Sequence, residues 1–186
     1  MSILFEHANI LITEENGFSE IENGYLGVEG TKINYIGKER PNDVYDEVKN
    51  FSNKLLMPGL INTHCHAAMT MLRGLGSDLP LQEWLFEKMM PVEDRFTANS
   101  MKAASELALL EMISTGTTSF CDMYFINEAT VLPCLEAGIK ANISRPMQSF
   151  DPNDVYETMI RKLEADKLYK EYNGAGDGRI LIDDSI

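Results

Sequence analysis

Two histidines stand two residues apart, at the end of an apolar run that the sequence predicts to be a β-strand, Leu60–His66. Because side chains on a strand alternate between its two faces, His64 and His66 point to one face and Cys65 to the other. Two imidazoles that converge in this way can hold one divalent ion, and zinc–nitrogen distances of about 2.0–2.1 Å suit their span. The pair therefore predicts a metal site. The alternative for so short a pattern is a chance pair on an exposed strand end.

The elements that must position this pair alternate between strand and helix from residue 58 onward. Strands are predicted at residues 60–66, 118–121, 139–145 and 179–183, and helices at residues 81–89, 97–116, 128–137 and 151–174. Such alternation implies parallel strands joined by right-handed crossovers. The predicted strands fit either a small open sheet or about half of a (β/α)₈ barrel, which takes roughly 250 residues.

The first 57 residues follow a different pattern. They form short strand-like runs separated by the turn signals Asn16-Gly17, Asn23-Gly24 and Gly30-Thr31. We therefore expect two domains, with β-strands in residues 1–57 and the strand–helix units in residues 58–186. A few short strands do not make a stable sheet alone, so the first domain needs further strands or a packed neighbour.

Composition excludes several classes of partner. A net charge of −13 and a pI near 4.6 argue against nucleic acid and anionic membranes, because both repel an acidic protein. The sequence shows neither a signal peptide nor an apolar stretch of the roughly 20 residues that span a bilayer. Three cysteines without C-x-x-C spacing argue against a disulfide framework. These features predict a cytoplasmic protein.

The segment that carries the histidines, MPGLINTHCHAAMTMLRG at residues 57–74, resembles the first barrel strand of the amidohydrolase superfamily. The run at residues 70–96 and the segment CDMYF at residues 121–125 resemble the branch that deaminates S-adenosylhomocysteine and 5′-methylthioadenosine. The resemblance implies an α/β fold: the first half of a (β/α)₈ TIM barrel, preceded by strands of a small β-sandwich domain. In the family, both chain ends contribute to that sandwich.

The resemblance also implies roles for individual residues. His64 and His66 match the first two metal ligands, which would hold Zn²⁺ or another divalent metal such as Fe²⁺, one ion per complete site. Glu93 matches a carboxylate that binds the ribose hydroxyls, and Arg145 matches an arginine of the substrate pocket. Without the resemblance, both would be read as exposed charges at the ends of elements. The family has a second arginine shortly afterwards, and residues 146–151 offer none.

The catalytic residues of the family come from later strands, so none is assigned here. The implied function is a metal-dependent hydrolytic deaminase of an adenosine-type nucleoside, in which activated water attacks C6 of the ring. This half chain is expected to be inactive alone. The alternatives are another amidohydrolase, of the chlorohydrolase or guanine deaminase type, and a non-catalytic truncated half that pairs with another chain. Association through exposed barrel edges, including homo-oligomers, is also expected.

Three further residues with reactive side chains are interpreted as structural. Asp122 follows a predicted strand, where a core or capping role is favoured over metal ligation. Cys65 is expected to pack behind the histidine strand, and His7 to belong to the first β-region.

Overall fold

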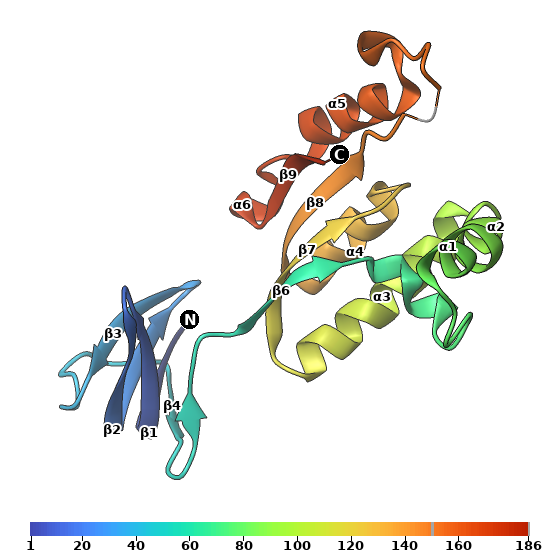
Figure 1. Cartoon of the computed structure of the whole chain (residues 1–186). Coiled ribbons are helices and arrows are strands. Elements are labelled where there is room, and N and C mark those ends of the chain that lie inside the picture. Colours follow the sequence, from blue (N-terminus) through green and yellow to red (C-terminus); the bar gives the residue numbers. More distant parts are fainter. Residues whose placement is uncertain (150, 186) are drawn as a thin grey trace. The chain divides into compact units, whose positions relative to one another are not determined.

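The computed structural model describes residues 1–149 and 151–185, and the chain divides into two compact units, Met1–Pro58 and Gly59–Ile186 (Figure 1). Phe150 and Ile186, which belong to the predicted barrel segment, lie outside the described residues. In the described part of the chain, no helix is both long enough and apolar enough to cross a bilayer.

The first unit is a mainly antiparallel sheet. Its strands are β1 (Ser2–Glu14), β2 (Gly17–Glu29), β3 (Lys32–Gly37), β4 (Glu47–Asn50) and β5 (Leu55–Leu56). They lie in the order β3-β2-β1-β4, and the short β5 pairs with β1. The described residues of this unit form this one sheet and no second sheet facing it. Glu29 pairs with Lys32 across the predicted turn, and Gly30 has the left-handed φ of +60° that such a turn requires.

One predicted turn is wrong. Asn23-Gly24 lies inside β2, at a shift in the β1–β2 register. Asn23 (φ 51°) and His7 (φ 61°) both adopt left-handed backbone there, and Nδ1 of His7 lies 3.1 Å from Oδ1 of Asn23. The Asn-Gly pair thus forms a β-bulge instead of ending the strand, because a bulge demands the same unusual backbone as a turn. His7 takes part in this bulge.

The second unit is built on a parallel sheet. Its strands are β6 (Leu60–Cys65), β7 (Thr117–Met123), β8 (Lys140–Pro146) and β9 (Ile180–Ser185), in the order β6-β7-β8-β9. Each neighbouring pair is parallel. The longer connections contain α3 (Ala98–Ser114), α4 (Glu128–Ala137) and α5 (Ile160–Tyr172). This arrangement confirms the α/β fold class and the strand–helix alternation that the sequence predicts.

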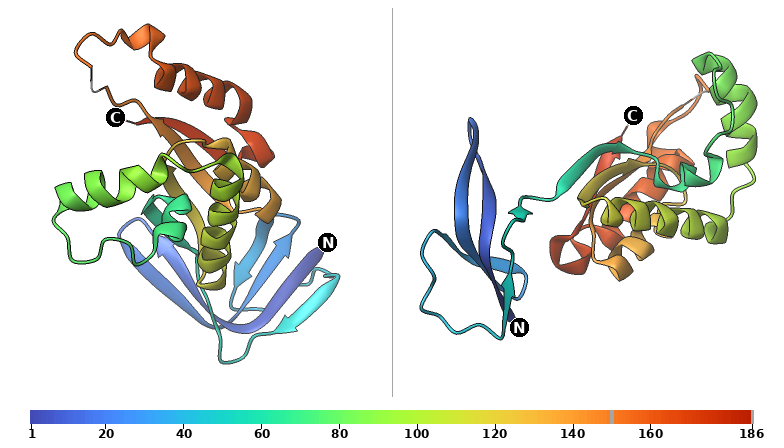
Figure 2. Two further views of the ribbon diagram at one scale, coloured as in Figure 1. Left: turned by 90° about the vertical axis from the view of Figure 1, so that its right-hand side faces the viewer. Right: turned by 90° about the horizontal axis from the view of Figure 1, so that it is seen from below.

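The larger hydrophobic core lies between the helices and the sheet. It is formed by alternate residues of the strands, such as Phe120, Ile143 and Ile182, against helix residues such as Val131 and Leu168. Figure 2 shows these helices packed along the strands. The strand residues between the core residues are more polar, and they lie on the other face of the sheet.

Shorter helical pieces complete the unit. They are η1 (Ala67–Leu72), α1 (Leu81–Glu83), η2 (Trp84–Met89), α2 (Met90–Glu93), η3 (Tyr156–Thr158) and α6 (Ala175–Gly178). The predicted ends of two helices are confirmed: Thr97 caps α3 through a reciprocal pair of hydrogen bonds with Ser100, and α4 ends at Gly138 with a φ of 76°.

The predicted helix after residue 151 begins later than expected. The Asp151 carboxylate accepts hydrogen bonds from the backbone and side chain of Asn153, a local arrangement that competes with helix formation. α5 therefore starts at Ile160 and buries Ala165 and Leu168, while Leu163 is 52% exposed.

Candidate metal and nucleoside site

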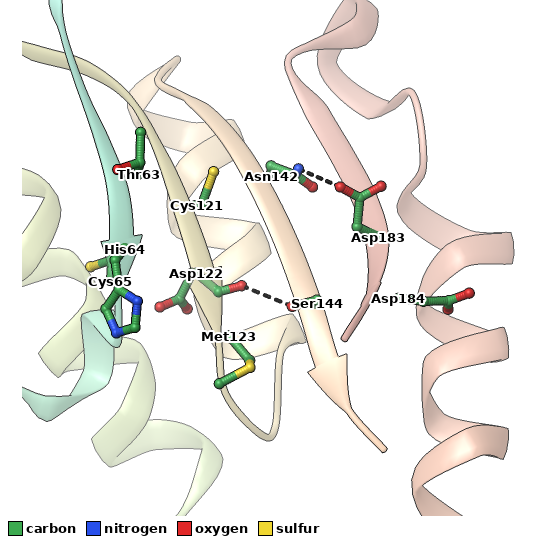
Figure 3. Close-up of a pocket in the computed structure, with 10 residues that line it drawn as sticks. All are labelled: Thr63, His64, Cys65, Cys121, Asp122, Met123, Asn142, Ser144, Asp183 and Asp184. Carbon is green, nitrogen blue, oxygen red and sulfur yellow. Dashed lines mark hydrogen bonds between the residues drawn. The ribbon is translucent and has the colours of Figure 1, made fainter. Parts of the chain in front are cut away.

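His64 and His66 lie together at the carboxyl end of β6. Their ring centroids are 5.1 Å apart and the ring planes meet at 81°. His64 is exposed, and His66 is half-buried immediately before η1. Cys65 packs against the core between sheet and helices, and Figure 3 shows its sulfur and the His64 ring on opposite sides of β6. The side chains of His64 and Cys65 therefore point to opposite faces of the strand, as the sequence predicts.

The backbone of β7 fixes the orientation of His66. Nδ1 of His66 lies 2.7 Å from the carbonyl oxygen of Met123. A carbonyl can only accept, so Nδ1 carries a proton, and in a neutral ring Nε2 then keeps its lone pair. Metal-binding histidines commonly have this arrangement, because the bond on one nitrogen sets the tautomer and direction of the other.

Asp122 holds the chain just past the histidine pair. It is 2% exposed, and its Oδ1 accepts a hydrogen bond of 2.8 Å from the backbone N–H of Ala67, the first residue of η1. Its Oδ2 is buried without a hydrogen-bond partner in the part of the chain that the structure describes. Burial raises the pKa of Asp122 to about 7. Asp122 thus caps a helix, one of the two roles favoured from the sequence.

The thiol beside the metal pair is held in its neutral form. Burial, together with the charge of Asp122, raises the pKa of Cys65 to about 12. Because metals bind the thiolate, Cys65 is a packing residue at neutral pH. All three cysteines are free thiols.

Glu93 reaches the same region from the end of α2. The hydroxyl of Tyr124, which follows β7, donates a hydrogen bond to Oε1 of Glu93. Oε2 of Glu93 has no hydrogen-bond partner among the described residues. The Tyr124 ring lies 5.9 Å from the His66 ring, centroid to centroid, and stacks on Phe125 at 4.4 Å. Burial and the hydrogen bond to Glu93 raise the pKa of Tyr124, so the hydroxyl stays protonated and remains a donor.

Arg145 lies elsewhere. Its Nε donates to Oε2 of Glu164 on α5 at 2.7 Å, and its side chain is 14% exposed. Along β8 it shares a face with Ala141 and Ile143, both members of the core. The structure thus brings Glu93 to the histidine pair through Tyr124, and it places Arg145 against the helix layer. A substrate role for Arg145 stays a prediction.

A shallow pocket of about 260 Å³ includes His64 in its wall (Figure 3). Its floor contains Cys121, Asn142 and Ser144, and the Asn142 amide donates to Asp183 at 2.6 Å. Small and polar side chains on three adjacent strands leave room for a polar ligand beside the histidines.

The donor set fits part of a metal site. Among the described residues, no three His, Cys, Asp or Glu side chains converge closely enough to hold an ion. The histidine pair supplies two nitrogen ligands, one with its orientation fixed by Met123. A catalytic zinc site usually takes three protein ligands and keeps one position open.

Sequence comparison decides the family. Residues 55–179, more than half of the chain, match the Amidohydrolase family. The chain belongs to the amidohydrolase family. The 5-methylthioadenosine/S-adenosylhomocysteine deaminase of Halothermothrix orenii is 38% identical in an alignment 186 residues long, which covers 97% of this chain and 42% of that protein. This amidohydrolase chain therefore spans less than half the length of the curated relatives it matches.

Solved structures support the fold of this amidohydrolase. A zinc-bound adenosine deaminase from Xanthomonas campestris gives a TM-score of 0.84 at 24% identity, over 98% of this chain and 42% of that one. A guanine deaminase from C. acetobutylicum with bound guanine also gives 0.84, at 19% identity, over 100% of this chain and 46% of that one. At these identities the likeness establishes the shared fold alone.

Sequence reasoning missed two features of this site. Tyr124 was not singled out, although a tyrosine directly after a strand end is a signal that could have found it. The Met123 carbonyl carries no signal in residue type, because every residue offers the same backbone group.

Proposed function

We propose that the protein carrying this chain is a metal-dependent aminohydrolase of an adenosine-type nucleoside, such as S-adenosylhomocysteine or 5′-methylthioadenosine. The observation that carries the proposal is the His64–His66 pair at a parallel-strand end, with the His66 Nδ1–H bonded to the Met123 carbonyl. Carboxyl ends of barrel strands are where such enzymes collect their catalytic groups. The name of the relatives that are 38% identical supports the substrate class.

In this proposal His64 and His66 hold a divalent ion, Zn²⁺ or Fe²⁺. When bound, the ion supplies Lewis acidity that activates water at neutral pH. Met123 keeps the His66 proton on Nδ1, so Nε2 is available without a change of tautomer. Cys65 stays neutral behind the strand and does not compete for the ion.

Glu93 is proposed to bind the ribose. Tyr124 occupies one carboxylate oxygen and thereby orients the group, while Oε2 is left to accept from a sugar hydroxyl. A carboxylate can accept both hydrogen bonds of a cis-diol. The contact between Tyr124 and His66 connects this sugar site to the metal pair.

For Arg145 to bind substrate, its guanidinium would have to leave Glu164. Two variants separate the roles. If Arg145 binds substrate, Arg145→Ala raises KM and Glu164→Gln does not; if the ion pair is only structural, both lower stability and leave KM unchanged.

We further propose that residues 1–186 expressed alone do not deaminate, since the residues that the structure describes bring together fewer ligands than a catalytic zinc site needs. A cytoplasmic location also belongs to this proposal, and three free thiols agree with it. The nucleoside is the proposed partner. Association of chains through open sheet edges is also proposed, and the molecular mass of the protein in solution tests it.

The test is ammonia release by the complete protein from 5′-methylthioadenosine, S-adenosylhomocysteine, adenosine and guanine. We expect activity on the adenine nucleosides, its loss after dialysis against a chelator, and its return with Zn²⁺ or Fe²⁺. Deamination that survives complete metal removal would refute the metal-dependent mechanism. A preference for guanine would refute the substrate class alone.

A further inference from the structure

The β6–β7 ladder is irregular where the histidines stand. Cα pairing runs from Asn62 with Phe120 to Cys65 with Asp122, so three steps on β6 match two on β7. Regular sheet hydrogen bonds therefore do not by themselves set the position of the chain at His64 and His66. Other contacts must do so, because a metal ligand needs a fixed direction.

The contacts that replace the ladder come from consecutive residues at the end of β7. The Asp122 carboxylate accepts from the N–H of Ala67, and the Met123 carbonyl accepts from the ring of His66. These two bonds hold two consecutive residues, His66 and Ala67, at the end of β6 and the start of η1. The end of β7 is thus hydrogen-bonded to the chain at the point where β6 ends and η1 begins.

The N–H of Ala67 needs this partner. Ala67 is 1% exposed and is the first residue of η1, where backbone N–H groups have no partner within the helix. His66, which precedes the helix, does not cap it with its own side chain. Asp122, 55 residues away in the sequence, takes the place of a local cap.

The end of β7 is itself held in place by hydrogen bonds to Asn127 and to β8. The buried side chain of Asn127 donates to the carbonyl oxygens of Tyr124, at 3.3 Å, and Ser144, at 3.0 Å. The N–H of Tyr124 donates to the same Ser144 carbonyl at 3.3 Å. A carboxylate mounted on a strand end that is tied to β8 can impose its position on the neighbouring chain.

We infer that Asp122 is a positioning residue for the metal pair: through the Ala67 N–H it fixes the chain directly after His66, and with it the direction of the His66 ring. This inference rests on the proposed metal site. It assigns to Asp122 a role distinct from ligation, since its bonded oxygen faces a backbone N–H at the helix layer.

Two variants of the complete protein separate positioning from packing. Asp122→Asn keeps an oxygen that can accept from Ala67, whereas Asp122→Ala removes it. Ser105→Ala is the matched control, because it breaks another buried polar contact, the 3.0 Å bond to Thr130 between α3 and α4. If Asp122→Ala does not fold, Asp122→Ser replaces it, with a hydroxyl too short to reach the Ala67 N–H.

Two readouts are measured on each variant. The first is the ring tautomer of His66 in metal-free protein, from the ¹⁵N shifts of the imidazole. The second is the zinc dissociation constant, from competition with a chelator. We expect Asp122→Ala to mix the tautomers and to weaken zinc binding by about 10–100-fold, the usual effect of losing an outer-shell partner. Asp122→Asn should restore the single tautomer and most of the affinity, and Ser105→Ala should change only the melting temperature.

The outcomes distinguish the two proposals. If the unaltered protein binds no divalent ion, the proposed function fails, and the tautomer measurement still decides whether Asp122 sets the direction of the His66 ring. If zinc binds and Asp122→Ala leaves both affinity and tautomer unchanged, the positioning role is wrong and the carboxylate serves only to stabilise the fold.

Discussion

The Tyr124 hydroxyl donates a hydrogen bond to the Glu93 carboxylate, and the same tyrosine ring lies 5.9 Å from the ring of His66. One side chain therefore contacts both a predicted sugar-binding group and a predicted metal ligand. These groups come from parts of the chain about 30 to 60 residues apart, and the end of β7 brings them together. This relationship makes the proposed site testable residue by residue.

Removing the hydroxyl of Tyr124 should weaken nucleoside binding. We expect Tyr124→Phe to raise KM by roughly tenfold and to change kcat less, because a hydrogen bond to a charged group contributes about 1.5–3 kcal/mol. Steady-state kinetics on the complete protein would show this. Tyr35→Phe, which removes a hydroxyl bonded to the Glu39 carbonyl in the first unit, is the matched control. Equal effects of both substitutions would contradict the role given to Tyr124.

Glu93 should discriminate sugars that carry hydroxyls. We expect Glu93→Gln to raise KM for an adenine ribonucleoside by about tenfold, since hydrogen bonds to a charged acceptor are the stronger ones. For the 2′,3′-dideoxy analogue the change should be small. The comparison of the two KM ratios isolates the ribose contact. Equal ratios would mean that Glu93 acts through the fold.

The histidine pair should account for metal binding. We expect His64→Ala and His66→Ala each to weaken zinc binding by more than the roughly 10–100-fold typical of outer-shell changes. Metal content by mass spectrometry and chelator competition measure this. His7→Asn is the control, because asparagine tolerates the left-handed backbone at that position. Zinc retained at full affinity in both pair variants would place the ion elsewhere.

Asp122 should give the metal-free protein a characteristic pH dependence. Burial raises its pKa from 3.8 to about 7, so the folded protein binds this proton more tightly than the unfolded chain. The stabilisation is complete below pH 3.8 and is lost as the pH rises through about 7. Urea unfolding at several pH values should show this decline, and Asp122→Asn should remove it. Parallel curves for the two proteins would show that Asp122 does not titrate in this range.

Much of this structure follows from sequence patterns. The strand–helix alternation, the Thr97 cap, the Gly138 end and the shared position of His64 and His66 all follow from side-chain periodicity and local backbone preference. These are short-range properties that a sequence displays directly.

What could not be predicted depends on contacts between distant residues. The bond from His66 to the Met123 carbonyl joins residues 57 apart, and one of its partners is a backbone group present at every position. The Asn23-Gly24 pair predicts a turn where the structure has a bulge, because both use the same backbone region. The resemblance implies a substrate role for Arg145, and this role stays a prediction; the side chain shares a face of β8 with Ile143 and pairs with Glu164 on α5.

The alternation of faces along β7 and β8 has a consequence for how such proteins diverge. Phe120 and Ile143 build the core, while their neighbours Cys121, Asn142 and Ser144 line the pocket. Substitutions at the pocket positions can alter ligand preference with little loss of core packing. A single-residue deletion within either strand would instead exchange the two sets and damage both at once. New specificities on this scaffold should therefore arise by point substitution in the strands and by length changes in the loops beyond them.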